Sequence, residues 1–524
     1  MKKLFASISR TVLNANSAVL LLIICAAWLA ITAGVRPLML PDEGRYVGVA
    51  WEMLNSGNWL VPTLDGMPFF HKPPLFYWLT ALDLKLFGMN EWAARLASVL
   101  SAVLATGVMV AFVRRYVDKP TANLTAIVLV TQPFFFAGAQ FADLNMLVAA
   151  MISVSIVAGA DAALRLERGL PYLASLTTAF VFAALGVLAK GLIGFVLPGA
   201  ILLAWLLVRR RLKQLPSLLP LNLLLLFFVL VVPWFGWMQH SYDGFWDYFF
   251  VYHHFHRFAA TGFNNQQVFW FYVPVLILAT LPWSPWIYRS CSPSFLKDPE
   301  RFDIRSLMIL WTLGILVFFS VPSSKLVGHI LPALPPFAYL IADGLLLWLK
   351  ASKRPAASAI VGLSIAVAGV TCVVLVLLVT RFDTRSFSAA SLPISKIYDV
   401  NDQIVMLEEY QYDLPFYLKA KKSPWVIGAW RNSEPPTKDN WRKELYDAGL
   451  FDQKGMQENL ISPGEFALRL CAPGSGPFWL WGRAGLASRY SFLKDKDVVF
   501  SDGKKTMWRL VGGCVADPEA KQEN

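Results

Sequence analysis

The sequence predicts an all-α polytopic membrane protein with a C-terminal mixed α/β soluble domain. Three observations lead to this fold class. Of the 524 residues, 56% are hydrophobic and only 16% are charged, and the mean hydropathy is +0.50, which is typical of membrane proteins. Apolar runs long enough to cross a hydrocarbon core recur up to about residue 380. Beyond residue 381 the apolar runs shorten to strand length.

The membrane spans are predicted from the apolar runs. The first run follows Lys2, Lys3 and Arg10. We interpret it as a retained anchor, because it is longer than a signal-peptide core and no clear cleavage site follows. The segment 73–88 is too short to cross easily, so we expect an amphipathic helix lying on the outer leaflet. Eleven spans are expected, at about 16–35, 93–113, 121–139, 144–163, 172–189, 191–208, 216–236, 268–288, 306–321, 327–348 and 357–380.

The distribution of charge predicts the orientation of these spans. The net charge is +12, and much of it lies in short loops between apolar runs, such as Arg114-Arg115 and 209–213. Loops of this kind face the cytoplasm. A cytoplasmic N-terminus puts every such loop inside and, with an odd number of spans, puts the C-terminus outside. No basic groove interleaved with aromatic residues is visible, so we expect no nucleic-acid partner.

The segment beyond residue 381 has the character of a small soluble domain. Its strand-length runs lie at 403–407, 423–428, 478–482, 497–501 and 507–511. We therefore divide the chain into a transmembrane domain, residues 1–380, with its first outer loop at 36–92, and an α/β domain, residues 381–524. Cys471 and Cys514 would be able to form a disulfide there if this domain lies outside the cytoplasm.

Polar residues beside the spans gather on the outer side of this topology. The topology rests on the apolar runs and the basic loops and not on these polar residues, so their agreement is independent support for it. Polar residues near a membrane are costly and are often functional. They are Asp42, Glu43, Arg45, His71, Lys72, Asp143, Lys190, the YHHFHR cluster at 252–257, Lys325 and His329.

Acids facing cations at an outer membrane surface suit a lipid-bound phosphate. A carboxylate of Asp42, Glu43 or Asp143 would act as general base toward an acceptor hydroxyl. Cations would neutralise the phosphate and lower the barrier where charge develops on the leaving group. The cations expected at the phosphate are Arg45, Lys72, Lys190 and Lys325.

Several of these residues have an ordinary structural alternative. Asp42 would serve equally well as the N-cap of a helix running 43–55. Lys72 would be an interfacial lysine whose stem lies along the membrane. The histidine cluster would form an interfacial belt, although three nearby histidines, His254 among them, also permit metal binding.

Several motifs carry a resemblance to a known family. PDEGRYVGVAWEML, followed by GMPFFHKPPLFYW and NEWAARL, resembles the first outer loop of the lipid-phosphate-dependent glycosyltransferases. These membrane enzymes include the protein O-mannosyltransferases and the aminoarabinose transferases of lipid A. GVLAKGLIGFVLPG at 186–199 and SSKLVGHILPALPPFAYL at 323–340 are similar to the aminoarabinose branch in particular. The resemblance covers about residues 15–350.

The resemblance implies a GT-C fold, with up to thirteen spans in that branch, and a sugar donor carried on a polyprenyl phosphate. It implies that Asp42 is the essential first-loop acid, with Tyr46 in the same motif beside the donor phosphate. It implies that Lys72 is a donor-phosphate ligand, that Asp143 is a second outer acid, and that Arg257 binds phosphate.

Two positions depart from the family pattern. His71 stands before Lys-Pro-Pro where aminoarabinose transferases usually have Glu, at a position implicated in metal binding. His329 stands before Ile-Leu-Pro where they usually have Tyr, at a position near the donor. The metal candidates are therefore His71 and His254, and a divalent metal is the one cofactor expected.

The function expected is transfer of a sugar, 4-amino-4-deoxy-L-arabinose or a related one, from a polyprenyl-phosphate donor. The acceptor expected is lipid A or another envelope glycolipid, on the periplasmic side of a bacterial inner membrane. A transporter or flippase of a lipid-linked sugar is an alternative, but it should place polar residues near the midplane, often on broken helices in repeated halves. An O-antigen ligase would share the side and the substrates but not the Asp-Glu and Lys-Pro-Pro loop.

Overall fold

The computed structural model describes residues 2–13, 15–256, 265–296, 298–352, 355–430, 436, 438–494 and 496–511. The chain divides into two compact units. We call Met1–Arg36, Lys72–Leu79 and Glu91–Phe382 the membrane unit. We call Pro37–His71, Thr80–Asn90 and Asp383–Asn524 the tail unit.

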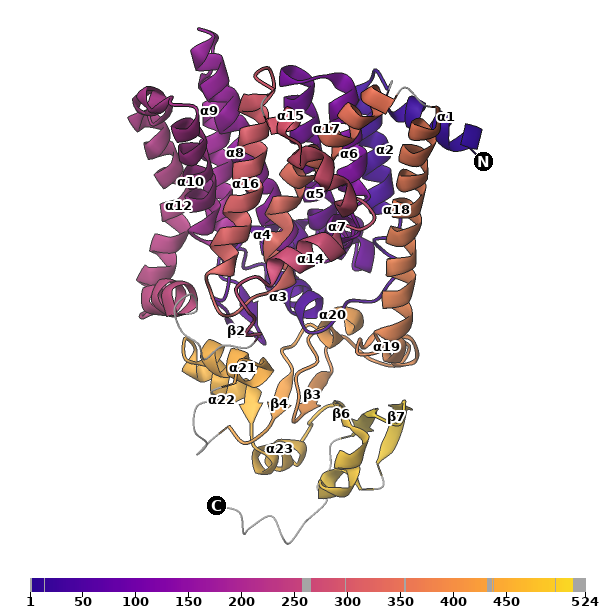
Figure 1. Ribbon diagram of the computed structural model, residues 1–524. Coiled ribbons are helices and arrows are strands. Elements are labelled where there is room, and N and C mark those ends of the chain that lie inside the picture. The colour runs from indigo at the N-terminus through magenta and orange to yellow at the C-terminus, as the bar shows by residue number, and fades with distance from the viewer. Residues whose placement is uncertain are drawn as a thin grey trace. The chain divides into compact units, whose positions relative to one another are not determined.

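The membrane unit consists of helices. They are α1 (Lys2–Leu13), α2 (Ala18–Ala30), α5 (Glu91–Tyr116), α6 (Lys119–Val130), α7 (Pro133–Ala139), α8 (Leu144–Glu167), α9 (Leu173–Lys190), α10 (Ile193–Val208), η1 (Leu212–Gln214), α11 (Leu215–Leu218), α12 (Leu221–Ser241), the π-helix η2 (Asp247–His256), α14 (Tyr272–Ala279), η3 (Ser284–Cys291), α15 (Pro293–Leu296), α16 (Phe302–Ser320), η4 (Val327–Ala333), α17 (Leu334–Ser352) and α18 (Pro355–Phe382). Figure 1 shows α8, α9, α10 and α16 running side by side, and α8 packs on α9 and α10. Helix α4 (Leu75–Phe87) has residues in both units.

The membrane unit makes this an integral membrane protein. Seven helices of the described chain are long and apolar enough to cross a membrane, or eight if the bent pair α6–α7 counts as one span. Helices α2 and α10 are apolar but shorter. The count of eleven spans stays a prediction.

Prolines break two of the predicted spans. The span expected at 268–288 is wrong as a continuous helix, because α14 ends at Ala279 and the 3-10 helix η3 follows Pro282. The span expected at 121–139 bends by 68° between α6 and α7, where Pro133 begins the second helix. Proline lacks the N–H that would continue the helical hydrogen bonds, and its ring clashes with the preceding turn.

Two arginines of the predicted basic loops, Arg209 and Arg305, are paired with acids from neighbouring helices. Arg209 donates to both carboxylate oxygens of Glu167 at 2.8 Å and to Asp303 at 2.7 Å. Arg305 donates to the fully buried Asp343 at 2.7 Å. These buried and half-buried pairs hold helix ends together, since breaking one would leave an uncompensated charge.

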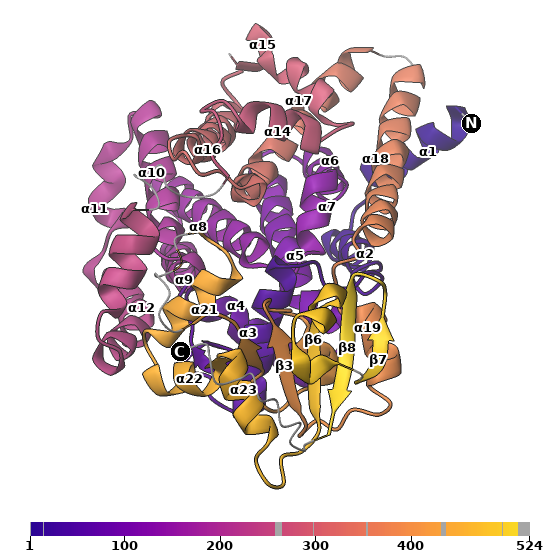
Figure 2. The same cartoon turned by 90° about the horizontal axis from the view of Figure 1, so that it is seen from below.

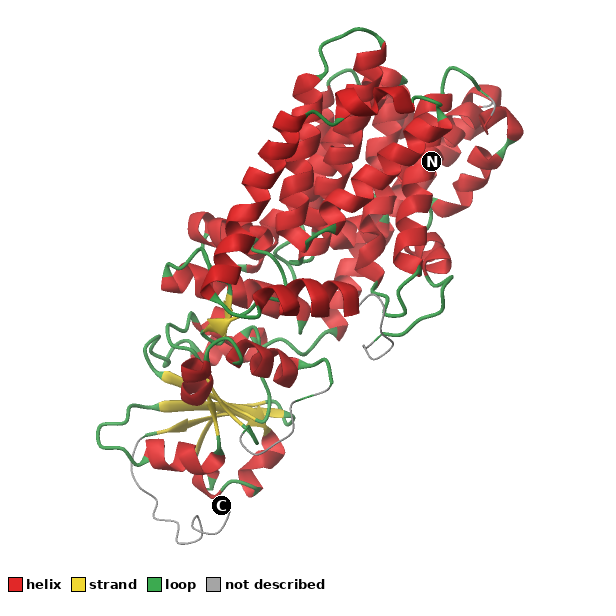
Figure 3. Cartoon of the chain, turned by 90° about the vertical axis from the view of Figure 1, so that its left-hand side faces the viewer, coloured by secondary structure: helices red, strands yellow, loops and turns green. Residues whose placement is uncertain are grey.

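The tail unit is built around a six-stranded mixed sheet. Its elements are α3 (Asp42–Ser56), β1 (Thr63–Leu64), β2 (Met67–Pro68), α19 (Ser388–Ile394), β3 (Gln403–Leu407), α20 (Leu414–Leu418), β4 (Trp425–Ile427), α21 (Trp441–Gly449), α22 (Gln453–Asn459), β5 (Leu460–Ile461), α23 (Pro463–Leu470), β6 (Phe478–Arg483), η5 (Ala484–Ser488), η6 (Ser491–Leu493), β7 (Asp497–Ser501) and β8 (Lys505–Leu510). The strand order is β5-β4-β3-β6-β8-β7. The first four strands are parallel to one another, and β8 runs antiparallel to both of its neighbours, β6 and β7. Figure 2 shows β3, β6, β8 and β7 in this order, and Figure 3 shows helices on both sides of the strands.

Alternating side chains give the sheet two buried faces. Val405, Leu407 and Leu480 face one hydrophobic cluster with Phe466 and Leu470 of α23. All five predicted strands are confirmed, as β3, β4, β6, β7 and β8. The short strand β5 was not predicted. Cys514 lies outside the described residues, so its disulfide with Cys471 stays a prediction.

Most of the first outer loop belongs to the tail unit, whereas sequence analysis grouped it with the transmembrane domain. Two glycines one turn apart on α3 allow this packing. A Cβ on Gly44 would lie 3.0 Å from the Cβ of Tyr412, and one on Gly48 would lie 3.2 Å from the Tyr412 carbonyl oxygen. The indole N–H of Trp51 donates to the carbonyl of Ala420 at 3.1 Å. The loop is therefore anchored by backbone contacts that no local pattern encodes.

Candidate functional site

The predicted site residues are divided between the two units. The membrane unit contains Lys72, Asp143, Lys190 and Lys325, and the tail unit contains Asp42, Glu43, Arg45, Tyr46 and His71. Arg257 and the side chain of His254 lie outside the described residues.

In the membrane unit, Asp143 is joined to Lys190 through one amide. Asp143 is the N-cap of α8, and its Oδ1 accepts from the backbone N–H of Asn145 at 2.8 Å. Its Oδ2 accepts from Nδ2 of Asn145 at 2.5 Å. Oδ1 of Asn145 accepts from Nζ of Lys190 at 2.6 Å. The Asn145 amide thus uses its donor end on an acid and its acceptor end on a cation, which fixes both charged groups.

Lys190 is placed by the packing of α9 on α10. A Cβ on Gly194 would lie 2.1 Å from the backbone carbon of Gly186, so glycines are required at this crossing. Lys190 is the last residue of α9, which ends at Gly191 with a φ of 88°. The motif GVLAKGLIGFVLPG at 186–199 therefore sets the position from which the Lys190 side chain extends.

Neighbouring loops close around Asn145. A Cβ on Gly328 would lie 2.8 Å from Nδ2 of Asn145, so a larger residue there would push the amide aside. Oγ of Ser98 donates to the carbonyl of Phe141 at 2.8 Å, which holds the loop just before Asp143. Residues from three distant motifs thus support one short hydrogen-bonded chain.

Two arginines hold the beginning of α5, next to this loop. Arg95, which is fully buried, donates to the carbonyls of Ala33 at 2.6 Å and Arg36 at 2.8 Å. Arg36 donates to the carbonyl of Gln140 at 2.6 Å. These bonds tie the beginning of α5 to the backbone at residues 33–36 and to the segment that ends at Asp143.

Lys325 is buried and holds a loop. Its Nζ donates to the carbonyl of Gln267 at 3.0 Å and to that of Pro322, and its backbone pairs with Asn265 at 3.0 Å. Burial lowers the pKa of Lys325 below its ordinary value. These contacts are those of a lysine that joins two chain segments. Its binding of phosphate stays a prediction.

His329, which stands where aminoarabinose transferases usually have Tyr, lies against Tyr272. The Tyr272 hydroxyl donates to the carbonyl of Leu326 at 3.0 Å and lies 3.5 Å from Nδ1 of His329. The His329 ring stacks on Phe319 with centroids 5.0 Å apart. The imidazole is therefore fixed by packing on one side and by a phenol on the other.

In the tail unit, Asp42 is an exposed acid paired with Arg45. The N-cap of α3 is Pro41 and makes no side-chain cap, so the alternative that Asp42 caps this helix is wrong. Oδ1 of Asp42 accepts from Arg45 at 2.7 Å, and the Asp42 side chain is 52% exposed. Its Oδ2 accepts from no side chain in the described part of the chain. Asp42 therefore presents a carboxylate oxygen that can take a proton from a ligand.

Arg45 is fixed from its other side by the tail. Its Nη1 donates to Oε1 of Glu444, whose Oε2 accepts from the Tyr412 hydroxyl at 2.6 Å. The Arg45 guanidinium lies 5.5 Å from the centroid of the Tyr46 ring. Glu43, which is fully buried, accepts from the backbone N–H of Met39 at 2.8 Å. Glu43 thus stabilises the turn before α3, while Arg45 orients Asp42.

Helix α3 and the hairpin β1–β2 bring together two carboxyls that sequence analysis missed, those of Glu52 and Asp65. Glu52 accepts from Oγ1 of Thr63 at 2.7 Å and from the backbone N–H groups of Asp65 and Gly66 at 2.7 and 3.0 Å. The Asp65 side chain is fully buried, and neither of its oxygens has a hydrogen-bond partner in the described part of the chain. Burial, reinforced by the Glu52 carboxylate, raises the pKa of Asp65 well above its ordinary value.

We expect Asp65→Asn to stabilise the tail unit at neutral and alkaline pH. A raised pKa in the folded state means that the stability of the wild type is fully present below the unfolded pKa and is lost as pH rises through the folded pKa. Asparagine carries no charge and tolerates the φ of 57° at this turn. The gain should be about 1–3 kcal/mol at alkaline pH and should vanish in acid.

Denaturant unfolding followed at several pH values measures this gain. Asp497→Asn, which removes an exposed acid on β7, is the matched control and should leave stability unchanged. A difference between Asp65→Asn and wild type that does not grow with pH would contradict the expectation.

Of the two residues expected to bind a metal, His71 and His254, only His71 has a described side chain. The His71 ring packs 4.3 Å from the centroid of the Phe69 ring. No group of three or more His, Cys, Asp or Glu side chains suited to a metal is found within the described residues. With His254 outside them, the divalent metal stays a prediction and no chemical step proposed for the protein passes through it.

Sequence reasoning missed the residues that position the site. Asn145 stands two residues after a predicted acid, and an amide beside a loop acid was a usable signal. Arg95 stands in the NEWAARL motif, but its partners could not be read from the sequence. Glu444 and Tyr412 gave no signal, because the segment they contact lies far away in the sequence.

Comparisons with known proteins agree with the fold and with the motifs. Residues 71–237, which include Lys72, Asp143 and Lys190, match the family model described as dolichyl-phosphate-mannose-protein mannosyltransferase. The chain is 31% identical, over 360 residues, to an undecaprenyl phosphate-alpha-4-amino-4-deoxy-L-arabinose arabinosyl transferase of Erwinia tasmaniensis, covering 67% of this chain and 64% of that relative. It is 34% identical, over 313 residues, to a protein of the same description from Sodalis glossinidius, covering 59% of this chain and 55% of that relative. The matched region thus spans less than two thirds of these relatives.

A solved structure matches nearly the whole chain. The crystal structure of ArnT from Cupriavidus metallidurans bound to undecaprenyl phosphate superposes with a TM-score of 0.77 at 21% identity, covering 94% of this chain and 97% of that one. The chain therefore has the GT-C fold, and its resemblance to the lipid-phosphate-dependent glycosyltransferases, the aminoarabinose transferases in particular, is confirmed.

Proposed function

We propose that this protein is a membrane glycosyltransferase that moves 4-amino-4-deoxy-L-arabinose, or a related sugar, from a polyprenyl-phosphate donor to lipid A or another envelope glycolipid. The observation that carries this is the Asp143–Asn145–Lys190 chain, which presents a fixed cation within the segment that matches the family model. A fixed ammonium suits a phosphate diester that becomes a monoester and gains negative charge as the sugar leaves. The names of the relatives support the sugar and the donor.

The roles of the other residues follow from their chemistry. In the proposed reaction the acceptor oxygen attacks the anomeric carbon of the sugar and gives its proton to Asp42. The bond from that carbon to the phosphate breaks, and polyprenyl phosphate leaves. Lys72 and Lys190 neutralise the phosphate. Arg45 orients Asp42 through the bond at 2.7 Å.

Mass spectrometry of lipid A and other glycolipids tests this function. Cells that express the protein should gain a glycolipid heavier by one aminopentose or related sugar, and cells that express Asp42→Asn should not. Donor that reaches the outer leaflet without any sugar transfer would indicate a flippase instead. No change in any glycolipid would refute the proposed transfer.

The proposed site faces the periplasm of a bacterial inner membrane, and sidedness is a separate prediction. Alkaline phosphatase fused after residue 390 should be active, because that enzyme folds only outside the cytoplasm. A fusion after Arg211, in a predicted cytoplasmic loop, should be inactive and is the matched control. The reverse pattern of activities would overturn the orientation.

A further inference from the structure

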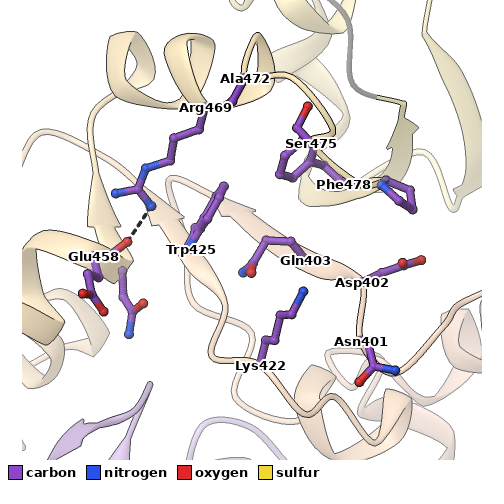
Figure 4. Close-up of a pocket in the computed structure, with 13 residues that line it drawn as sticks. Asn401, Asp402, Gln403, Lys422, Trp425, Glu458, Arg469, Ala472, Ser475 and Phe478 are labelled. Atoms are coloured by element: carbon purple, nitrogen blue, oxygen red, sulfur yellow. Dashed lines mark hydrogen bonds between the residues drawn. The ribbon is translucent and has the colours of Figure 1, made fainter.

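A groove on the tail unit is lined by none of the residues assigned to transfer. Two adjoining cavities of about 580 and 490 Å³ share Gln403, Lys422, Trp425, Glu458 and Asn459 in their walls. The larger cavity opens beside the starts of β3, β4 and β6 and the end of α23 (Figure 4). Cavities of this size hold small organic ligands.

Three amide side chains present oxygen atoms to the groove. Nε2 of Gln403 donates to the carbonyls of Ile404 at 3.0 Å and Ser423 at 2.9 Å. Nδ2 of Asn459 donates to the carbonyl of Asp65 at 2.7 Å, and Nδ2 of Asn401 donates to Asp399 at 3.0 Å. A carbonyl oxygen cannot donate, so these bonds fix the amide orientations. The amide oxygens are therefore the ends left to accept hydrogen bonds from a ligand.

Hydrogen-bond donors line the groove beside these amide oxygens. Figure 4 shows Lys422, Gln403, Trp425 and Arg469 around one space. The Lys422 ammonium and the indole N–H of Trp425 have no partner among the described residues. Arg469 is ordered, because its guanidinium lies 4.5 Å from the centroid of the Trp425 ring and donates to the carbonyl of Glu458 at 2.7 Å.

The charges of the groove are balanced. Lys422 and Arg469 in the larger cavity are matched by Asp402 and Glu458. Such a wall does not favour a multiply charged phosphate. It favours a ligand whose groups both donate and accept, and sugar hydroxyls do both.

We propose that this groove binds the hydroxyl-rich rings of an uncharged saccharide. The sugar hydroxyls donate to the oxygens of Gln403, Asn401 and Asn459 and accept from Lys422 and from the indole N–H of Trp425. Binding here is independent of transfer, since no residue of the proposed reaction lines the groove.

Binding by the full chain in phosphatidylcholine nanodiscs, which carry no sugar headgroup, tests this site. The probes are cellobiose, lactose and chitobiose, with inorganic phosphate as the charged control, measured by saturation-transfer NMR and titration calorimetry. At least one disaccharide should bind and phosphate should not. Lys422→Ala and Trp425→Phe should each weaken that binding about threefold to tenfold, as expected for one lost hydrogen bond.

The controls separate a specific site from weak surface binding. Lys421→Ala removes the adjacent exposed lysine, which does not line the groove, and should leave affinity unchanged. Trp425→Phe removes the indole N–H but keeps an aromatic ring for Arg469 to pack against. Failure of all three disaccharides to bind, binding of phosphate alone, or affinity unaltered in both groove variants would overturn the proposal.

Discussion

Asp42→Asn is expected to lower the rate of sugar transfer by about 10²- to 10⁴-fold, the usual contribution of a general base, while donor affinity stays close to that of the wild type. The physical reason is that the amide cannot take the proton of the acceptor, although its oxygen can still accept from Arg45, as Oδ1 of Asp42 does at 2.7 Å. Single-turnover transfer and lipid-donor binding, measured on the same purified protein, separate the two effects.

A matched control accompanies the Asp42 variant. Asp243→Asn removes another exposed acid, one that follows α12 on the side predicted to be periplasmic, and should leave turnover unchanged. Near-normal turnover in Asp42→Asn would mean that Asp42 is not the base. Helix capping would not explain that result, because Pro41 is the N-cap. Asp143 or Glu43 would then become the candidate base.

Lys190→Ala is expected to weaken binding of the lipid donor about tenfold to a hundredfold, which is the usual effect of losing one charge-assisted contact to phosphate. Asn145→Ala should weaken it about threefold to tenfold, because the ammonium would lose the oxygen that holds it at 2.6 Å. Donor affinity is measured by titration of the purified variants with the polyprenyl-phosphate sugar.

The double variant, which combines Asn145→Ala with Lys190→Ala, tests whether Asn145 acts by positioning Lys190 or contributes to donor binding separately. If Asn145 acts through Lys190, the combined loss should be no larger than that of Lys190→Ala alone, since the two side chains form one chain of hydrogen bonds. Lys213→Ala, on the loop predicted to be cytoplasmic, is the matched control and should bind donor normally. Additive losses, or unchanged affinity in Lys190→Ala, would contradict the proposed role.

The strands of the tail and most of the spans were predictable because their signals are local. The short apolar runs QIVML and FWLWG match β3 and β6, which are buried along most of their length because successive side chains face opposite covered sides of the sheet. Most long apolar runs became helices for a similar reason, since backbone groups in a hydrocarbon core must be satisfied within the segment. The prolines at 282 and 285 were visible in the sequence, but apolar composition outweighed them in predicting a span at 268–288.

By itself, then, the sequence determined the membrane class, the existence of an α/β tail and the motifs that carry the acids and cations. Only the tertiary structure decided which of these groups meet. Asn145 reaches Lys190 because α8 packs along α9. Arg45 reaches Glu444 because Gly44 and Gly48 let α3 pack against Tyr412. A hydrogen bond depends on the positions of two atoms in space. When its partners lie hundreds of residues apart, as Arg45 and Glu444 do, no local pattern records it.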